Sequence, residues 1–393
     1  MTEDVIEFAH GCCFWMFGTS RILFCPDTIL FRLVCIAMNS DKPHIAIAMS
    51  GGVDSSVAAA LLVEQGYDVF AVMLRLWSTK PEFPNRCCTP KDAASAQSVA
   101  SMLDIPFHKL DTKALFKENV VDAFTDAYAR GITPNPCLIC NRTMRWGFLL
   151  NKVREMGATH LATGHYARIQ WFDGEHRLLR GKDRSKDQSY VLSVLRQSDL
   201  ASTIFPLGDL RKREVRQHAR RLNLPVAEKP DSQDLCFVSG GDYRDFLRQQ
   251  DIPLPPPGPI TDVDGTQIGT HDGLSNYTIG QRRGIGLSTP QALYVIEKQV
   301  ASNTLVVGSR SVLGRKIFTT EPVNWIAGRP PDPSIPLVVR VRYKASETPA
   351  ALHIRDDLSV EVHLAGPVPD ITPGQSAVFY SGEICLGGGV ILG

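Results

Sequence analysis

The sequence of 393 residues has no apolar run of the length that a membrane-spanning helix needs, which is about 18 residues. The nearest approach, ILFRLVCIAM at 29–38, is short and is interrupted by Arg32. We therefore expect no membrane partner.

Disulfide scaffolds are also excluded, because ten cysteines in a chain of this size are too sparse to staple a fold. No secretory signal precedes them. Both observations predict a cytoplasmic protein, and in a reducing compartment clustered cysteines indicate metal binding or catalysis.

No excess of one charge exists either, since 42 Lys and Arg face 41 Asp and Glu, a net charge of +1. Two local stretches, 177–186 and 211–221, are nonetheless rich in Lys and Arg. Such a stretch follows a nucleic-acid backbone or forms a solvated helix face, and charge alone leaves both open.

From His44 onward, short buried strands alternate with helices. This alternation predicts an α/β catalytic domain with a doubly wound parallel sheet. The expected strands are 44–49, 67–77, 107–112 and 159–167, and the expected helices are 55–66, 92–104 and 113–131. After about residue 250 proline, glycine and alternating apolar residues dominate, which predicts a small central domain and a C-terminal β-barrel. We expect an N-terminal extension outside the fold (1–42), the catalytic domain (43–205, with 227–240 returning to its active site), the central domain (206–320) and the barrel (321–393).

The segment SGGVDSS, residues 50–56, connects the first expected strand to the first helix. Two glycines let the backbone approach a ligand, and a helix N-terminus attracts phosphate. No Gly-Lys-Ser/Thr follows, which excludes a Walker loop. The alternative is a glycine turn with a helix cap.

Two irregular polar segments end in cysteine: TPNPCLIC at 133–140 and KPDSQDLCFV at 229–238. One thiol can carry a sulfane sulfur as a persulfide while a second thiol releases it, and both tasks require access and a lowered thiol pKa. Arg142 and Arg145 follow Cys140 and could supply the positive field.

These motifs, with ATGHYAR, KDQSYVL, YTIGQRRGIG and TPGQSAVFYSGEICLGGG, resemble the tRNA-specific 2-thiouridylase family of the ATP-pyrophosphatase (PP-loop) superfamily. The resemblance extends from residue 38 to 393. It implies ATP-dependent transfer of sulfur to the C-2 carbonyl of the wobble uridine in tRNA, through an adenylated intermediate with release of pyrophosphate and AMP.

The resemblance also assigns roles to residues. Cys236 would carry the persulfide, and Cys140 would resolve it. The residues implied for ATP are Ala48, Met49, Ser50, Gly51, Gly52, Val53, Asp54, Ser55, Leu74 and Gly164; for the target base Asn135, Pro136 and Cys137; and for tRNA His165, Lys186, Asp187, Gln188, Arg342, Tyr343 and Gln375.

Cys137 departs from the family pattern, in which an Asp is common at this position. Cys137, Cys140 and Cys236 could instead ligate a [4Fe–4S] cluster with one open iron for a hydrosulfide. A structural zinc with His165 as fourth ligand is a third possibility. The sequence leaves these mechanisms open.

We expect Mg²⁺ to accompany ATP, and tRNA, a sulfur donor (a cysteine desulfurase or relay protein) and a reductant to be partners. The competing enzyme hypothesis is a small-molecule PP-loop ligase that adenylates a carbonyl for attack by an amine. A non-enzymatic RNA-binding or metal-storage protein would leave SGGVDSS without a task. Two further features stay undecided: the pair Cys87 and Cys88, and the loop GQRRGIG at 280–286, which is either an RNA phosphate cradle or a plain turn.

Overall fold

A computed structural model describes residues 42–77, 89–231, 235–238, 242–250, 252–369 and 371–392, and three strands before them. The chain divides into two compact units, Met1–Pro43 and His44–Gly393. In the first unit, β1 (Glu7–Phe8), β2 (Cys12–Phe17) and β3 (Ser20–Phe24) form an antiparallel sheet. Cys87 and Cys88 lie outside the described residues.

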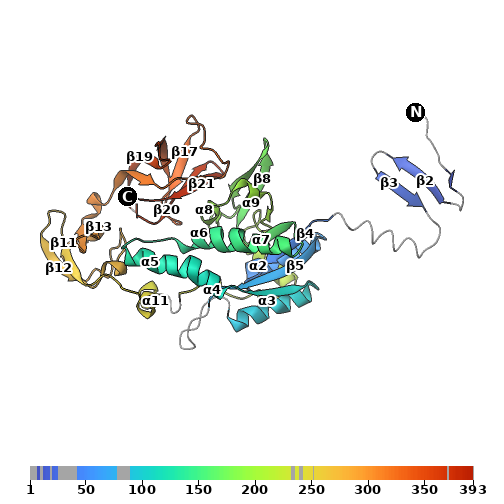
Figure 1. The fold of residues 1–393 in the computed structure, drawn as a ribbon, viewed down its shortest axis with the longest axis horizontal. Helices are drawn as coiled ribbons and strands as arrows, with labels where there is room; N and C mark the ends of the chain where they lie inside the picture. The colour runs from blue at the N-terminus through green and yellow to red at the C-terminus, as the bar shows by residue number, and fades with distance from the viewer. Residues whose placement is uncertain are drawn as a thin grey trace. The chain divides into compact units, whose positions relative to one another are not determined.

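The second unit is built on a parallel sheet of five strands (Figure 1). Its order is β10-β7-β4-β5-β6, and every neighbouring pair is parallel. The strands are β4 (His44–Ala48), β5 (Asp68–Arg75), β6 (Phe107–Asp111), β7 (His160–Thr163) and β10 (Thr203–Ile204). The chain runs outward from β4 through β5 to β6 and then returns to β7 on the other side of β4. In open parallel sheets, ligands bind where the order reverses, here at the carboxyl ends of β4 and β7.

Alternate residues of the strands face two separate cores. Ile45 and Ile47 of β4 point into one cluster with α2 (Val53–Glu64) and α3 (Pro90–Met102), while Ala46 points into the other with α7 (Leu150–Glu155). Helices therefore cover both faces, and the predicted doubly wound sheet is confirmed.

Local capping explains where these helices begin. Thr89 and Asp92 form a reciprocal capping box at the start of α3, and Pro90 occupies the first helical position, where its missing N–H costs nothing. The helix α2 starts after Gly52 and is rich in alanine, so it packs closely on the sheet.

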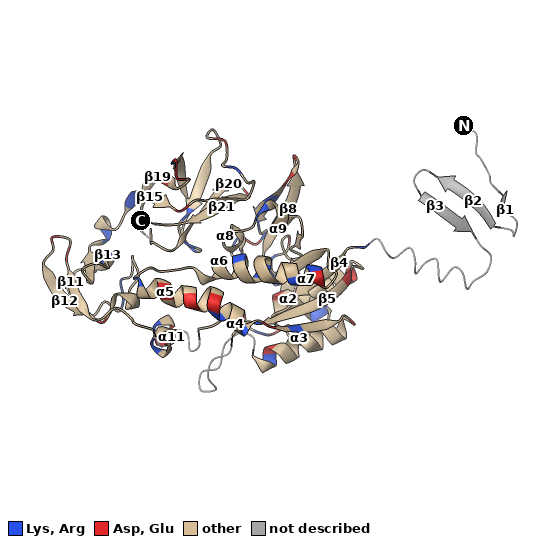
Figure 2. Ribbon diagram, in the orientation of Figure 1, with Lys and Arg blue, Asp and Glu red and all other residues tan. Residues whose placement is uncertain are grey.

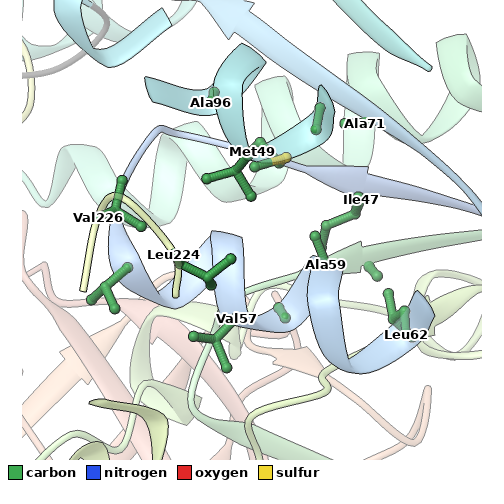
Figure 3. Close-up of a cluster of buried hydrophobic side chains, with 14 of the residues drawn as sticks. Ile47, Met49, Val57, Ala59, Leu62, Ala71, Ala96, Leu224 and Val226 are labelled. Carbon is green, nitrogen blue, oxygen red and sulfur yellow. The ribbon is translucent and has the colours of Figure 1, made fainter. Parts of the chain in front are cut away.

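The basic helix α10 (Lys212–Arg221), which the prediction assigns to the central domain, packs on the catalytic layer. Its buried Val215 and Ala219 share a cluster with α2. Figure 3 shows Leu224 and Val226, just beyond α10, beside Val57 of α2. Val215 and Ala219 are four residues apart and therefore lie on the same face of α10. The contact with α2 shows that this face is buried.

The described part of the chain contains further helical segments. They are α4 (Lys113–Phe116), η1 (Lys117–Asp122), α5 (Ala123–Ala129), α6 (Pro136–Cys140), η2 (Asn141–Leu149), α8 (Ser189–Leu192), α9 (Gln197–Leu200) and α11 (Tyr243–Gln249). The run α4–η1–α5 is continuous and confirms the long helix predicted for 113–131. No helix of the described residues combines the length and the apolar character of a membrane span.

Two more sheets follow. The central sheet has the order β12-β11-β14-β13 and contains β11 (Gly258–Thr261), β12 (Gln267–His271), β13 (Tyr294–Gln299) and β14 (Thr304–Gly308), with η3 (Leu274–Asn276) and η4 (Arg310–Val312) beside it. The C-terminal sheet has the order β15-β19-β18-β17-β20-β21-β9-β8. Its C-terminal strands are β15 (Arg315–Thr320), β16 (Asn324–Trp325), which pairs with β21, β17 (Leu337–Arg340), β18 (Thr348–Ile354), β19 (Val360–Val368), β20 (Ser376–Ser381) and β21 (Ile384–Val390).

The hairpin of β8 (Ala167–Phe172) and β9 (Glu175–Arg180) was not predicted from the sequence. Its turn residues Asp173 and Gly174 both have positive φ, as a tight hairpin turn requires. Leu178 and Leu179 of β9 pair with β21, so a hairpin of the catalytic domain extends the C-terminal sheet. This pairing fixes the C-terminal sheet to the catalytic domain.

We predict that Leu62→Ala lowers the free energy of unfolding by about 2–5 kcal/mol, because it leaves a cavity between α2 and the sheet. Leu62 is 1% exposed in the cluster shown in Figure 3. Urea unfolding monitored by circular dichroism measures the change. Met102→Ala on α3, where Met102 is 52% exposed, is the control and should cost little. Equal losses in both variants would contradict the placement of α2.

Candidate functional site

The loop between β4 and α2 has the properties of an anion site. The N–H groups at positions 51–55 meet no acceptor among the described residues. A Cβ on Gly52 would meet only Ser50 Oγ, at 3.5 Å, so the space over Gly52 is open. Unsatisfied N–H groups and the positive end of the α2 dipole favour phosphate at this point.

Gly51 is required by its surroundings. Its φ is +74°, and a Cβ there would lie 2.2 Å from the carbonyl oxygen of Asp92. The ammonium of Lys229 donates to the carbonyl oxygen of Gly51 at 2.9 Å and to the Asp92 carboxylate. Burial would raise the pKa of Asp92, but hydrogen bonds from Lys229 and Thr89 outweigh it and lower the pKa. Lys229 and α3 together therefore hold the loop in shape.

Gly164 follows β7 and lies against the start of α2. A Cβ at Gly164 would meet the backbone of Ser55 and Asp54 at 2.9 and 3.0 Å. The carboxyl ends of β4 and β7 thus meet at Gly51 and Gly164, at the point where the strand order reverses. Of the other residues predicted for ATP, Ala48 and Met49 lead into this loop from β4, and Leu74 is the last residue but one of the neighbouring strand β5.

An ionic network surrounds Asp54, the acidic residue of this loop. Asp54 accepts hydrogen bonds from Tyr166 Oη at 2.7 Å and from Lys212 Nζ at 2.7 and 2.8 Å. Lys212 also contacts Asp231 at 2.9 Å, and Asp231 binds Lys186 at 2.9 Å. Burial would raise the pKa of Asp231, but its hydrogen bonds to Lys212 and Lys186 lower the pKa to about 2.

The segment TPNPCLIC, which its prolines predicted to be irregular, begins a helix. Asn135 caps α6 through a hydrogen bond from Cys137 N to its side chain at 3.2 Å, and Pro136 occupies the first turn. Cys137 is exposed, whereas Cys140, one turn further along, is buried. The prediction that Cys140 lies on an accessible loop is therefore wrong for this state of the protein.

The thiol pKa values also differ from expectation. Burial raises the pKa of Cys140, and it raises the pKa of Cys137 to about 11, in each case against the opposing effect of Arg145. Cys137 reaches solvent on one side and is enclosed by protein on the others, which reconciles its exposure with its desolvation. The expected lowering by Arg142 fails because its guanidinium donates to the carbonyl oxygen of Val194, at 2.6 Å.

Cys236 comes to the same apolar cluster as Cys140. The cluster contains Phe116, Phe124 and Phe237, and the partly buried Cys236 packs against it. The 229–238 segment is thus anchored at one end to the phosphate loop by Lys229 and at the other end beside Cys140. Two cysteines nearly a hundred residues apart in sequence are brought together by this segment.

The C-terminal sheet supports the loop that carries the predicted target-base residues. Gln375 Nε2 donates to the carbonyl oxygens of Thr133 and Pro134 at 2.9 and 3.1 Å. A Cβ on Gly374 would lie 2.2 Å from Ile132 Cγ2, so the two loops touch. The side chain of Gln375 is therefore occupied within the protein, where it positions Asn135 and Pro136.

The other residues predicted to contact tRNA divide into two groups. Lys186 and Tyr343 are partly open to solvent, and Tyr343 Oη donates to the carbonyl oxygen of Asp187 at 3.1 Å. The side chain of Asp187 is buried and accepts hydrogen bonds from the backbone of Gly181 and Ser189, at 3.1 Å each. Its carboxylate stabilises the loop and cannot reach a ligand.

Gln188 and His165 are likewise occupied internally. Gln188 Oε1 accepts a hydrogen bond from Tyr166 N at 3.0 Å. His165 is buried, its Nδ1 lies 2.7 Å from Thr163 Oγ1, and burial together with Arg145 lowers its pKa well below the usual value. A neutral, buried His165 is better suited to packing beside the site than to binding an RNA phosphate.

The basic helix α10 is also more occupied than its charge predicted. Arg216, Arg220 and Arg221 pair with Asp231, Glu228 and Glu64, at 2.7 to 2.8 Å. Figure 2 shows that both basic and acidic residues occur along the elements of the second unit. The prediction that α10 binds RNA as a basic face is therefore not supported by its geometry.

No group of three His, Cys, Asp or Glu side chains among the described residues is arranged to hold a metal ion. A recess of about 600 Å³ at the β8–β9 hairpin is lined by Trp171, His176 and Arg329 and contains none of the predicted site residues. The backbone approach at Gly51 and Gly164 identifies the nucleotide site better than this recess does.

Sequence reasoning missed the residues that organise the site. Lys229 and Asp231 stand in KPDSQDLCFV, the motif quoted for Cys236, and Lys212 begins the basic helix. A lysine and an aspartate so near an expected catalytic cysteine were the available signal. Lys229 pairs with Asp92 and Lys212 pairs with Asp54, and both partners are more than a hundred residues away and could not be inferred.

Comparisons with known proteins agree with this organisation. Family models match residues 43–240 (tRNA methyl transferase HUP domain), 244–309 (tRNA methyl transferase PRC-barrel domain) and 315–391 (Aminomethyltransferase beta-barrel domain). Among solved structures, a 4-thiouridine synthetase–RNA complex with bound ATP aligns with a TM-score of 0.35 and 18% identity over 53% of this chain and 50% of that one, which is too weak a likeness to bear on function.

Curated relatives match nearly the whole chain. The tRNA-specific 2-thiouridylase MnmA of Chloroflexus aurantiacus (strain ATCC 29366 / DSM 635 / J-10-fl) is 44% identical over 351 residues, 88% of this chain and 98% of its own. That of Syntrophotalea carbinolica is 44% identical over 354 residues, 90% of this chain and all of its own. That of Roseiflexus sp. (strain RS-1) is 43% identical over 367 residues. The chain therefore belongs to the tRNA-specific 2-thiouridylase family.

Proposed function

We propose that this protein transfers sulfur to the C-2 carbonyl of the wobble uridine of tRNA in an ATP-dependent reaction. The observation that carries the proposal is the 229–238 segment, which links the phosphate loop through Lys229 to the cluster that holds Cys140 and Cys236. An adenylating centre and a sulfur-transferring centre are thereby parts of one site. Relatives named for this reaction match nearly the whole chain.

The activation step uses the anion site at the start of α2. The unsatisfied N–H groups at 51–55 hold the ATP phosphates, and the C-2 oxygen of uridine attacks the α-phosphorus. Pyrophosphate leaves, and the base carries AMP on oxygen. Asp54 offers carboxylate oxygens of the kind that Mg²⁺ prefers, so it would hold the metal that accompanies ATP.

The sulfur step uses two thiols. A donor of sulfane sulfur, a cysteine desulfurase or relay protein, charges Cys236 as a persulfide. Its terminal sulfur attacks C-2, AMP leaves, and the Cys140 thiolate attacks the sulfur of Cys236. The S–S bond to the base breaks, the 2-thiouridine is released, and a Cys140–Cys236 disulfide forms, which an external reductant returns to two thiols.

One observation favours this mechanism over a cluster ligated by Cys137, Cys140 and Cys236. No metal-binding group is arranged among the described residues. We therefore derive no step through an iron–sulfur cluster or a zinc ion.

The raised thiol pKa values require a change when substrate binds. At neutral pH, Cys140 is protonated in its apolar cluster and is a poor nucleophile. Arg145, which donates to Asn141 Oδ1 at 2.7 Å, is the cation near both thiols. We propose that movement of the 235–238 segment exposes Cys140 to Arg145 and solvent when it resolves the persulfide.

Assay of pyrophosphate release tests the proposed function against a small-molecule PP-loop ligase. We expect release from ATP that depends on unmodified tRNA and 2-thiouridine in the recovered tRNA. Release that proceeds without tRNA and with ammonia or an amine would support the ligase. Absence of any release would contradict both enzymes.

Substitution of the cysteines separates the sulfur mechanisms. We expect Cys236→Ser and Cys140→Ser to reduce 2-thiouridine formation at least 100-fold while tRNA-dependent pyrophosphate release continues, because adenylation needs neither thiol. Nucleoside analysis by mass spectrometry measures the product. The matched variant is Cys137→Asp, which keeps both thiols and should remain active. A loss in Cys137→Asp as deep as in Cys140→Ser would contradict the two-thiol mechanism and support a three-thiolate cluster.

Removal of the Lys229 ammonium should affect both halves of the site. Hydrogen bonds that involve a charged group contribute about 1.5–3 kcal/mol, so we expect Lys229→Ala to lower kcat/KM for ATP about 10- to 100-fold. The rate at which iodoacetamide alkylates Cys236 should also cease to respond to ATP. Lys91→Ala, an exposed lysine on α3, is the control. If ATP still alters Cys236 alkylation in Lys229→Ala, the segment does not couple the two centres.

A further inference from the structure

The loop at 280–293 in the central domain combines a recess with two unpaired arginines. The recess has a volume of about 190 Å³ and is lined by Arg282, Gly284, Gly286, Thr289, Gln291 and neighbouring apolar residues, with no acidic side chain. Arg282 and Arg283 are exposed, and their guanidinium groups form no ion pair or hydrogen bond with any residue that the structure describes. Many other arginines of the chain are paired, as those of α10 illustrate.

The loop is held open by its own contacts. Gln281 accepts a hydrogen bond from Thr278 N at 3.1 Å and donates to the carbonyl oxygen of Arg283 at 2.9 Å. Gly284 and Gly286 have φ values of +75° and +83°, and the buried Ile285 between them anchors the loop in the core of the central sheet. The N–H groups of 282–286 meet no acceptor among the described residues, so they remain available with the guanidinium groups.

A chain of contacts connects this loop to the proposed target-base site. Arg342 donates to the carbonyl oxygen of Ile279 at 2.8 Å and to Thr372 Oγ1. Thr372 begins the turn whose Gln375 holds the loop before Asn135. Tyr343, adjacent to Arg342, is 36% exposed and offers a ring for base stacking. The arginine loop, the Arg342–Tyr343 pair and the base site are therefore successive parts of one assembly.

We propose that residues 280–293 form a subsite for the phosphate backbone of the substrate RNA. The phosphates bound there belong to the RNA chain that leads to or from the target nucleotide at Cys137. Arg282 and Arg283 pair with phosphate oxygens, and the N–H groups of the glycine turns donate to the same groups. The recess without acidic residues has the electrostatic character of an anion site. This inference rests on the proposed function, since it assigns to the same substrate a second contact area.

Binding of unmodified tRNA as a function of salt tests the subsite. Each phosphate contact contributes about 0.7 to 0.9 to the slope of log K against log salt, so Arg282→Ala/Arg283→Ala should reduce the slope by between about 1 and 2. The control, Lys91→Ala/Lys109→Ala, removes the same charge from exposed residues of the catalytic domain and should leave the slope close to the wild-type value. Both arginines are exposed, so their removal should preserve the fold, which thermal unfolding checks.

Iodine cleavage of phosphorothioate-substituted tRNA gives a second readout. We expect wild-type protein to protect a few phosphates that the double-arginine variant leaves open, while protection at the anticodon itself persists. Equal slopes and equal protection in the arginine variant and the lysine control would overturn the subsite and leave the proposed function intact. Failure of the wild-type protein to bind tRNA at all would overturn both.

Discussion

The ammonium of Lys229 is the interaction on which the site depends most. It joins the carbonyl oxygen of Gly51 to the carboxylate of Asp92, and Asp92 in turn accepts from Thr89 at the start of α3. The carbonyl of a tight loop, the cap of a helix and a distant segment are thus held by one cation. Because all these groups are partly withdrawn from water, the hydrogen bonds to the charged ammonium are stronger than those at an exposed surface.

Through this contact, the short piece of chain that carries Cys236 is attached to the loop at 50–56. Cys236 follows Lys229 by seven positions, and Phe237, next to Cys236, is buried among aromatic side chains. Asp231, with Lys186, Lys212 and Arg216 around it, prevents the segment from swinging away from the sheet. Residues 229–231 and 235–238 are thus each held by contacts with the catalytic domain.

The C-terminal sheet contributes to the same site by support. Gln375 binds two carbonyl oxygens of the loop before Asn135, and β21 pairs with the hairpin of the catalytic domain. A barrel that is distant in sequence thereby determines how Asn135, Pro136 and Cys137 are presented. Family resemblance assigns tRNA contact to Gln375, whereas its geometry here gives it a positioning task as well.

A protonated Cys140 thiol in an apolar cluster is a suitable resting state for the proposed chemistry. A buried thiol with a raised pKa resists oxidation and premature disulfide formation, because the thiolate is the reactive species. Cys140 would then become a reactive thiolate only when the segment that carries Cys236 moves and exposes it. Arg145 is close enough to Cys137 and Cys140 to favour the thiolate form of both.

The sequence by itself determined the alternation of strands and helices and the glycine loop between β4 and α2, and through the family resemblance it predicted that Cys140 and Cys236 act together. These follow from local patterns: buried strands of period two, the glycines of SGGVDSS, and ordered motifs. Tertiary structure decided that TPNPCLIC begins a helix with Cys140 inside, that α10 packs on α2, and that the β8–β9 hairpin joins the C-terminal sheet. It also decided that the side chains of Asp187, Gln188 and Gln375 form hydrogen bonds within the protein. Burial and pairing depend on partners in other elements of the fold, some of them more than a hundred residues away, and no local pattern in the sequence specifies those partners.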